Sequence, residues 1–558
     1  MLVFLRKQIV NNHGAQYEYL RIVESVREKG RPVQKTLVNL GNTDKWDEPK
    51  LQQLIGILND YLGNPLEMAP AGLSLGDVHY GDCRLLGPYL PLAHLWDRLG
   101  MDAILSRALG VRKVHSSFTQ CVKAMTLVRL VRPRSKKALW EMLGRDTEIP
   151  GVSAQDISLQ GCYRALSYLD QAKDAVEKDV QQQLTHLFNQ DVSLVFYDLT
   201  SAYFEGTSCP RAKRGYSREH RSDLLQIEIG LLVDAEGIPI GHEVFDGNVK
   251  DVKTVIGTLE RLKKTFGVNR CVFVGDDGMA SIDNFHEIEQ HGYEYITSLS
   301  LGHSKIADSL CQNVRRPLEW SKLRDNLCMR SLAQEGTCRY IGAYNPERAR
   351  SSRRHRKEHL RACLTHLRHL QKGPKPHGRK LTPEEQLISA QNILRIKGCS
   401  HLMQAVLTPE RRLTWTLDRA AWRLDTHRDG LMILRTNSKT LSDDEVAIGY
   451  RTLWRAENAF RSIKDTMRLR PIRHWNDSRV LGHVFVCVLA YMLQRLFERD
   501  LEKAGLPLSA QAALDELNNI VIATLEAHGQ TLRRRSEITV RQRKILAAVG
   551  LSVVPEIW

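Results

Sequence analysis

Paired metal-binding cysteines are missing from this sequence. The 558-residue chain has 11 cysteines, and no two of them stand at C-x-x-C spacing. Zinc ribbons and fingers need such pairs, so the sequence argues against a structural zinc site. An odd number of scattered cysteines fits reduced thiols better than a disulfide framework, and we therefore expect a cytoplasmic protein.

Long apolar runs are also few. The most apolar late stretch, residues 484–493, is about half of the ~20 residues that a membrane-spanning helix needs. The amino terminus shows no apolar segment followed by a small-residue cleavage site, so no secretory signal is predicted. We therefore expect no membrane partner.

Acidic residues are outnumbered by basic ones. Lys plus Arg is 80 and Asp plus Glu is 64, so the formal charge is 80 − 64 = +16, and the sequence pI is about 9.3. This excess predicts a polyanionic partner. Nucleic acid is the first candidate, and the second, an acidic membrane surface, is weakened by the scarcity of apolar runs. An apolar content of 42% is ordinary for a globular protein, and the length suggests several domains.

Apolar periodicity divides the chain into regions of different type. Strand-like runs separated by the turn residues EKG predict a β-hairpin at 17–39, whereas 85–187 repeats apolar residues at helical spacing. The helical region is interpreted either as a DNA-binding domain or as a plain helical bundle. The expected parts are a β-hairpin module at 1–50, a helical region at 85–190, a first α/β part at 191–300, a basic insertion at 301–425, a second α/β part at 426–480 and a helical carboxyl-terminal region at 481–558.

Strands alternate with helices in the central region, which predicts a mixed α/β sheet. Asp251 is a candidate cap for a helix that follows it, and Ser442 with Glu445 forms a predicted capping box. The strand-like runs are 192–197, 226–233, 271–274, 293–297 and 430–435.

A dense basic segment lies in the predicted insertion. Arg348–Lys380 contains twelve Lys or Arg residues and one acid, Glu358. One interpretation is a solvated charged helix followed by a linker. The other, which we favour in a basic chain, is a surface that contacts phosphates without sequence preference.

Two aspartates follow apolar runs. Asp198 ends LVFYD and Asp276 ends CVFVGD, so hydrophobic strands would hold both carboxylates at the edge of a rigid sheet. A single aspartate after a strand is more often a turn or cap residue. A third carboxylate is therefore needed to distinguish a site from two turns.

Glu457 supplies this third carboxylate on a predicted helix. On a wheel of ~100° per residue, one face mixes aromatic groups with a carboxylate and several cations, unlike an apolar core face. The alternative is internal pairing, such as Glu457 with Arg461. The residues on that face are Tyr450, Leu453, Trp454, Glu457, Phe460, Arg461, Lys464 and Arg468.

Three carboxylates suit two Mg²⁺ ions, with Mn²⁺ as a substitute, because these ions prefer oxygen ligands. Such ions activate a water or a 3′-hydroxyl and stabilise the leaving oxygen. Asp198, Asp276 and Glu457 are therefore the candidate catalytic and metal-binding residues.

The spacing Tyr450-x6-Glu457-x6-Lys464 resembles the Y-R-E-K signature of IS4-type DDE transposases, most closely the IS1634 subgroup. YDLTSAYFEG resembles the first-aspartate motif and VFVGDDGMAS the second, while GYSREHRSDLLQ, GIPIGHEVFDGNVKD and RLRPIRHW also resemble family segments. One residue departs from the signature: Leu453 stands where the family has arginine, so Arg451 or Arg455 is expected to contact phosphate instead. Trp454 matches a tryptophan that stacks near a flipped base in relatives.

The resemblance implies an RNase H-like core interrupted by an insertion, and cut-and-paste transposition of an insertion sequence. It implies as partners double-stranded DNA with terminal inverted repeats, target DNA and a second copy of the chain in a synaptic homodimer, near the bacterial nucleoid. In some relatives cleavage passes through a hairpin intermediate. Two alternatives remain: a nuclease of the same fold that does not integrate, and an inactive DNA-binding descendant. The DNA-binding candidates are Tyr450, Arg451, Trp454, Arg455, Arg461, Lys464 and Arg468.

Overall fold

The protein is represented by a computed structural model of the whole chain. It describes residues 2–12, 15–28, 31–47, 50–51, 53–55, 78–110, 117–188, 194–217, 219, 221–249, 257–258, 260–261, 264–266, 271–275, 282–302, 304–313, 320–372, 381–527 and 530–557. The chain divides into two compact units, one of residues 1–81 with 525–532 and the other of residues 82–524 with 533–558.

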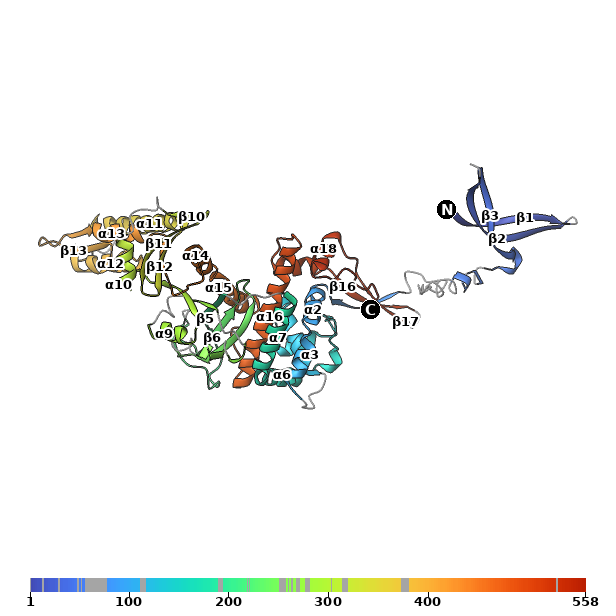
Figure 1. The fold of residues 1–558 in the computed structure, drawn as a ribbon, viewed down its shortest axis with the longest axis horizontal. Coiled ribbons are helices and arrows are strands. Elements are labelled where there is room, and N and C mark those ends of the chain that lie inside the picture. Colours follow the sequence, from blue (N-terminus) through green and yellow to red (C-terminus); the bar gives the residue numbers. More distant parts are fainter. Residues whose placement is uncertain are drawn as a thin grey trace. The chain divides into compact units, whose positions relative to one another are not determined.

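The first unit contains a three-stranded antiparallel sheet in the order β1-β2-β3 (Figure 1). The strands are β1 (Leu2–Asn12), β2 (Ala15–Glu28) and β3 (Arg31–Asn42). The predicted hairpin is confirmed by β2 and β3, which pair from Tyr19 opposite Asn42 to Glu28 opposite Arg31. Strand β1 was not predicted.

The second unit is built on a nine-stranded sheet in the order β10-β11-β12-β15-β9-β8-β5-β6-β7. Strands β5 and β8 are parallel, as are β8 and β9, and the other neighbours are antiparallel. The strands are β5 (Leu194–Tyr203), β6 (Gln226–Val233), β7 (Pro239–Asp246), β8 (Val272–Gly275), β9 (Glu294–Leu299), β10 (Ser321–Arg324), β11 (Leu327–Glu335), β12 (Cys338–Tyr344) and β15 (Leu431–Thr436). The prediction of a mixed α/β sheet is confirmed.

Strands β10, β11 and β12 were not predicted, although they extend the main sheet. Strand β10 has no buried residue and β11 only two, whereas five of the seven residues of β12 are buried without a period-2 alternation. Strands that lack a continuous apolar face give a weak period-2 pattern. Their position beside β15 is therefore visible only in the folded chain.

The predicted amino-terminal helical region is confirmed. Three of its helices, α2, α4 and α6, pack on the long helix α16 (Asp477–Lys503), which also packs against β7. One apolar core runs from these helices to the sheet. The helices are α2 (Tyr89–Arg98), α3 (Met101–Ala108), α4 (Ser117–Val131), α5 (Lys136–Met142), α6 (Leu159–Gln171) and α7 (Lys173–Phe188).

Helix α16 is long and apolar enough to cross a membrane by length and composition, with a mean hydropathy of 1.7. However, 83% of its apolar window is buried inside the protein. A core helix of a globular protein has this combination, because its apolar surface is already covered by neighbouring helices.

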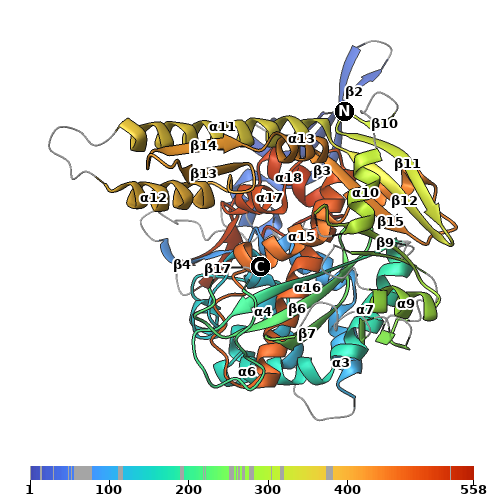
Figure 2. The same cartoon turned by 90° about the vertical axis from the view of Figure 1, so that its left-hand side faces the viewer.

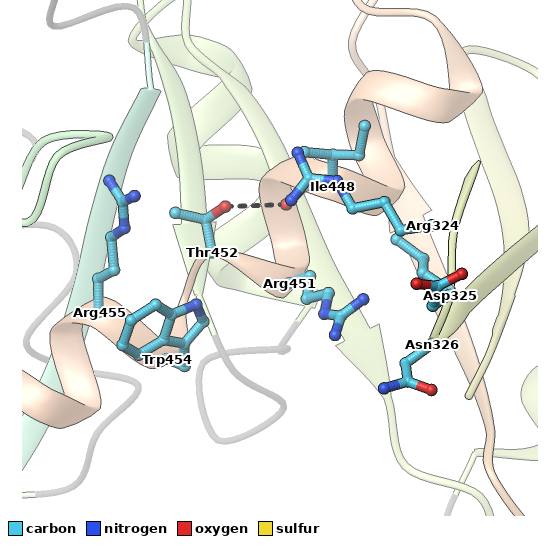
Figure 3. Close-up of a pocket in the computed structure, with 9 residues that line it drawn as sticks. Arg324, Asp325, Asn326, Ile448, Arg451, Thr452, Trp454 and Arg455 are labelled. Carbon is cyan, nitrogen blue, oxygen red and sulfur yellow. Dashed lines mark hydrogen bonds between the residues drawn. The ribbon is translucent and has the colours of Figure 1, made fainter. Parts of the chain in front are cut away.

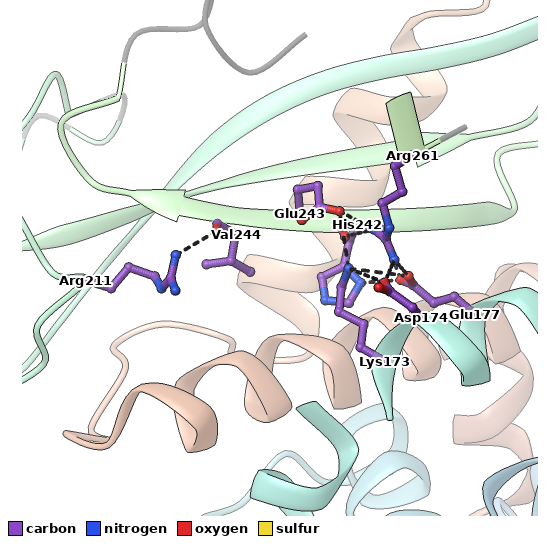
Figure 4. Close-up of polar contacts among 8 residues, drawn as sticks. All are labelled: Lys173, Asp174, Glu177, Arg211, His242, Glu243, Val244 and Arg261. Atoms are coloured by element: carbon purple, nitrogen blue, oxygen red, sulfur yellow. Dashed lines mark hydrogen bonds and ion pairs between the residues drawn. The ribbon is translucent and has the colours of Figure 1, made fainter. Parts of the chain in front are cut away.

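A buried ionic cluster joins α7 to β7 (Figure 4). Glu177 of α7 accepts hydrogen bonds from the backbone N–H of His242 (3.1 Å) and from its ring Nδ1 (2.7 Å), and Arg261 pairs with the same carboxylate. Burial alone would raise the pKa of Glu177, but Lys173, His242 and Arg261 more than offset it and hold that pKa well below its usual range. The cluster fixes the helical region onto the edge of the sheet.

The insertion between β12 and β15 folds around its own small core. Helix α12 begins with a capping box formed by Thr382 and Glu385. In Figure 2 these elements lie together as one lobe. They are α11 (Pro346–Lys372), α12 (Pro383–Ile396), β13 (Met403–Leu407), β14 (Leu413–Leu417) and α13 (Arg419–Arg428).

The prediction of a helical carboxyl-terminal region was wrong in part. Helices α17 (Ala510–Leu517) and α18 (Val540–Ala548) flank two strands, β16 (Val521–Ala527) and β17 (Gln530–Arg535). These strands belong to a small sheet in the order β17-β16-β4, where β4 is His79–Leu85. The β-branched residues at the start of β16 favour a strand, and the helical patterns around them hid this preference.

The remaining elements complete the second unit. The capping box predicted at Ser442 and Glu445 is confirmed at the start of α14, whereas Asp251, the other predicted cap, lies outside the described residues. The eleven cysteines are free thiols. The elements are α9 (Ile282–Gln290), α10 (Lys305–Asn313), α14 (Asp443–Arg451), α15 (Trp454–Arg461) and the π-helix Ser462–Thr466.

Candidate active site

Asp198 lies in the middle of β5 rather than at its end. The strand continues to Tyr203, so the prediction that Asp198 closes the strand was wrong, because TSAY pairs with β6 although it is less apolar. Asp198 stands opposite Leu231 of β6, and the backbone N–H of Leu199 donates to its Oδ1 (2.8 Å). A central strand thus holds this carboxylate in a fixed backbone frame.

Asp276 lies outside the described residues, but the strand before it is described. Strand β8 ends at Gly275, and among the described residues its last pair with β5 is Phe196 opposite Val274. Asp198 follows Phe196 by 198 − 196 = 2 residues, and Asp276 follows Val274 by 276 − 274 = 2 residues. Each aspartate therefore comes two residues after its own member of the parallel pair Phe196–Val274.

The segment that carries Glu457 is not one continuous helix. Helix α14 ends at Arg451, α15 begins at Trp454, and a π-helix follows from Ser462. Each break changes the rotation per residue from the ~100° of a regular α-helix. The single face predicted for 450–468 contains both buried residues, Leu453 and Phe460, and exposed ones, such as Trp454 and Glu457.

Helix α15 packs on β5 and β6. Its buried side consists of Ala456, Ala459 and Phe460, whereas Glu457 is exposed. The small alanines allow the helix to approach the sheet closely. The fold thus brings the helix of Glu457 onto the strand that carries Asp198.

The predicted DNA-binding residues around Trp454 have different surroundings. The Tyr450 hydroxyl donates to Ser298 Oγ (2.8 Å), and Leu453 is buried at 5% exposure in the apolar core. Arg455 donates to the carbonyl of Ala235. Arg451 is exposed. Of the two arginines proposed to replace the one missing at Leu453, Arg451 is thus the more accessible.

Trp454 lines an open cavity of about 510 Å³ (Figure 3). Its side chain is 52% exposed, and Arg451, Arg455 and Arg324 line the same cavity. The guanidinium of Arg455 lies 6.0 Å from the centroid of the Trp454 ring. The cavity therefore offers an aromatic face together with cations, a combination that suits nucleic acid.

The last three predicted cations are not equivalent. Arg461 and Arg468 are exposed, whereas Lys464 is 11% exposed and its Nζ lies 2.8 Å from Oε1 of Glu219. Lys464 thus already has a carboxylate partner in the folded chain.

The sequence did not single out Glu219 or Arg470, which meet at Lys464. Both lie in segments that resemble the family, GYSREHRSDLLQ and RLRPIRHW. The sequence also missed Arg324 of β10 at the Trp454 cavity. A search for charged residues within those segments would have found Glu219 and Arg470 but not their pairing.

A family model described as "Transposase DDE domain" matches residues 190–493, which is 304 of 558 residues. The chain belongs to the DDE transposase family. A second model, "IS1634 family transposase, N-terminal domain", matches residues 5–64. The chain is therefore an insertion-sequence transposase of the IS1634 type, an enzyme that cleaves and transfers DNA strands.

The transposase is only distantly similar to a solved structure. A piggyBac transposase in a synaptic complex with hairpin DNA matches at 10% identity and a TM-score of 0.37, covering 83% of this chain and 80% of that one. No curated protein matches the chain.

DDE transposases use divalent metal ions, and the donor chemistry fits them. Carboxylates such as Asp198 and Glu457 offer the hard oxygen ligands that Mg²⁺ and Mn²⁺ take. Among the described residues no three His, Cys, Asp or Glu side chains gather closely enough to hold a metal ion, and Asp276 is not among those residues.

Proposed function

We propose that Asp198, Asp276 and Glu457 form the catalytic centre of this transposase and bind two Mg²⁺ ions, which Mn²⁺ can replace. The observation that supports this most is the packing of α15 on β5, because it joins two segments that are far apart in the sequence. The equal offsets of the two aspartates from the Phe196–Val274 pair support it further, since residues of equal register on neighbouring parallel strands are neighbours across the sheet.

We also propose an RNase H-like core. Strands β7, β6 and β5 form an antiparallel meander, followed in the sheet by β8 and β9, which are parallel to β5. This order is typical of RNase H-like folds. The insertion between β12 and β15 separates the second aspartate from Glu457, as the family resemblance implies.

In this proposal the bound ions activate the attacking hydroxyl and stabilise the leaving oxygen. The protein itself positions the carboxylates. The antiparallel pairing of β5 with β6 holds Asp198 in place, and the packing of Ala456 and Ala459 holds the helix that carries Glu457. Exposure of Glu457 leaves its carboxylate accessible to the reacting phosphate.

The DNA end would lie along the exposed outer side of α15. Trp454 is placed to stack on a base, since its ring is half exposed beside three arginines. Arg451, Arg455, Arg461 and Arg468 would contact phosphates, and Tyr450 would orient the start of the segment. Such contacts position the duplex without reading its sequence.

Helix α11 offers a second surface for DNA. Two of its arginines, Arg353 and Arg356, pair with the buried Asp429. Six other cations are exposed and recur at helical spacing over 22 residues, or roughly 33 Å; none of them is ion-paired with another described residue. They are Arg350, Arg354, Lys357, Arg361, Arg368 and Lys372, and we name them the α11 stripe.

The partners we propose are the terminal inverted repeats of the element, target DNA and a second copy of the chain in the synaptic complex. We expect the reaction to take place at the nucleoid in a bacterial cytoplasm. An excess of positive charge favours such a location because it binds phosphates over a long range.

A nicking assay tests the catalytic centre. With Mg²⁺ and DNA from either end of the element, Asp198→Ala, Asp276→Ala and Glu457→Ala should each lower cleavage on the order of 1,000-fold. Binding of the same DNA in EDTA should remain within about threefold, since no phosphate-binding cation is removed.

Asp444→Asn is the matched control, because Asp444 is exposed in the first turn of α14 and should leave cleavage unchanged. Equal loss of binding in all three alanine variants would mean that these acids are structural and would refute the proposed centre. Cleavage without joining to a plasmid target would instead indicate a nuclease that does not integrate.

A further inference from the structure

A second cation-rich cavity lies where β5 meets the loop after the π-helix. The two segments are joined by backbone hydrogen bonds, from Ile472 N to Tyr203 O and from Glu205 N to Ile472 O, both 2.9 Å. The cavity has a volume of about 510 Å³, and we name it the Glu219 pocket. It is lined by Tyr203, Glu219, Arg221, Lys464, Asp465, Arg468 and Arg470.

One carboxylate joins two of these cations. Glu219 pairs with Lys464 at 2.8 Å and also with Arg470, which pairs in turn with Asp465 at 2.7 Å. The side chains of Glu219 and Lys464 are only 9% and 11% exposed. Burying either charge alone is costly, so each stabilises the other in the chain without DNA.

Two guanidinium groups meet the same aromatic ring. Arg221 lies 5.5 Å and Arg470 6.0 Å from the centroid of Tyr203. These contacts hold both cations at the pocket and limit the conformational entropy that binding must remove.

The backbone at Arg468 is also held in place. Arg468 has a left-handed conformation (φ 50°), which costs free energy for a side-chain-bearing residue. The buried Arg129 donates to the carbonyls of Met467 (3.1 Å) and Arg468 (3.3 Å). The folded chain thus fixes the wall of the pocket from which the exposed Arg468 side chain extends.

We propose that the Glu219 pocket binds a phosphodiester group of double-stranded DNA, and that Glu219 occupies the phosphate's place between Lys464 and Arg470 until DNA arrives. A carboxylate and a phosphodiester carry the same single negative charge and accept the same charge-assisted hydrogen bonds from Lys and Arg. The four cations of the pocket outnumber its two carboxylates together with Asp223, which lies outside the lining and pairs with Arg221 (2.9 Å), so a phosphate can enter beside Arg221 and Arg468. This inference rests on the proposed function in that the ligand is DNA.

The alternative is that Glu219 permanently positions Lys464 for its own contact with DNA. The two possibilities predict opposite changes in DNA affinity when the charge of Glu219 is removed. If Glu219 competes with phosphate, removing its charge strengthens DNA binding. If Glu219 positions Lys464, removing its charge weakens binding.

The experiment measures fluorescence anisotropy of a labelled duplex with the full-length transposase in EDTA, over a series of salt concentrations. One duplex comes from the DNA that flanks the coding frame and the other is its scrambled version. Glu219→Gln should tighten binding roughly tenfold for both duplexes, because phosphates carry no sequence information. Arg221→Gln and Arg470→Gln should weaken binding, and each should lower the salt slope by about one.

Glu205→Gln is the matched control. Glu205 pairs with Arg473 (2.8 Å) at the same junction but is 53% exposed and does not line the pocket; it should leave affinity unchanged. Weaker or unchanged binding by Glu219→Gln would overturn the proposal.

If Glu219→Gln fails to fold, as judged by thermal melting, DNA binding by the variant at the exposed Arg221 tests the proposal instead. Unchanged binding by Arg221→Gln would then overturn the phosphate site. Because this assay needs no cleavage, its failure is distinguishable from failure of the catalytic centre, which the Mg²⁺-dependent nicking assay reports.

Discussion

Trp454 is the exposed aromatic residue of the proposed DNA surface. Trp454→Ala should lower cleavage of the element's ends about tenfold to 100-fold, because stacking of one base contributes about 1–3 kcal/mol. The melting temperature should change little, since the indole is 52% exposed. Single-turnover nicking and thermal melting measure the two effects.

Trp454→Phe serves as the companion variant and should keep part of the activity, because it keeps an aromatic face. Loss of the folded state in Trp454→Ala would instead assign this residue to core packing.

Leu453 shows at the scale of one residue why a family signature does not carry over position by position. Its side chain is 5% exposed and belongs to the main apolar core. Restoring the family's residue with Leu453→Arg would bury a charge without a partner and should lower the free energy of unfolding by several kcal/mol. Chemical denaturation measures this loss, and a variant as stable as the parent would show that position 453 tolerates the family's arginine.

At the scale of elements, α11 differs from a simple charged linker. Its inner arginines are tied to Asp429, while the α11 stripe is exposed along one side. The triple variant Arg354→Gln, Arg361→Gln, Arg368→Gln should lower the slope of log affinity against log salt by up to about three, since each phosphate contact contributes about 0.9. Titration of a non-specific duplex at several salt concentrations measures the slope.

The matched control removes three exposed cations from the helical region, Lys137, Lys178 and Lys503, again as Lys→Gln. The control changes the net charge by the same amount as the triple variant. An equal decrease in the salt slope would therefore show that DNA binding depends on total charge and not on the α11 stripe.

The segment from α14 to the π-helix carries predicted site residues whose side chains differ in exposure. The predicted face includes both Phe460 and Trp454, but Phe460 is 4% exposed and Trp454 52%. Both residues belong to α15, where six positions at ~100° each place them about 120° apart, so one edge of the predicted face is buried and the other is exposed. Residue spacing grouped these residues but did not predict which side each one faces.

For the whole molecule, acid should be destabilising. Burial, with Lys136, Arg129 and Arg479 nearby, lowers the pKa of His474 to about 3 from 6.5, and the pKa of the buried His483 is lowered in the same direction. As the pH falls, the unfolded chain therefore binds protons at a higher pH than the folded chain does. The contribution of these histidines to the free energy of unfolding is complete above about pH 6.5 and decreases as the pH drops towards 3. The stabilising pairing of Glu177 is lost in addition below about pH 4.5.

Chemical denaturation at pH 7 and pH 5 measures this effect. For His474 alone the loss at pH 5 is about 2 kcal/mol, and His474→Gln should remove that part of the pH dependence. A variant that retains the full loss would show that His474 does not contribute to it.

The amino-acid sequence by itself determined the strand and helix types around the proposed centre, the excess of positive charge and the family. Apolar runs such as 226–233 predict strands because their own side chains must be buried, wherever the partners come from. The same local reasoning found Asp198 and Glu457 and the capping box of Ser442.

Only the tertiary structure decided which of these groups meet. The packing of α15 on β5, the burial of Leu453, the addition of β10–β12 to the sheet and the pairing of Glu219 with Lys464 all join segments that are distant along the chain. Periodicity reports the environment of each segment but not the identity of its neighbour, because many partners can bury the same apolar face.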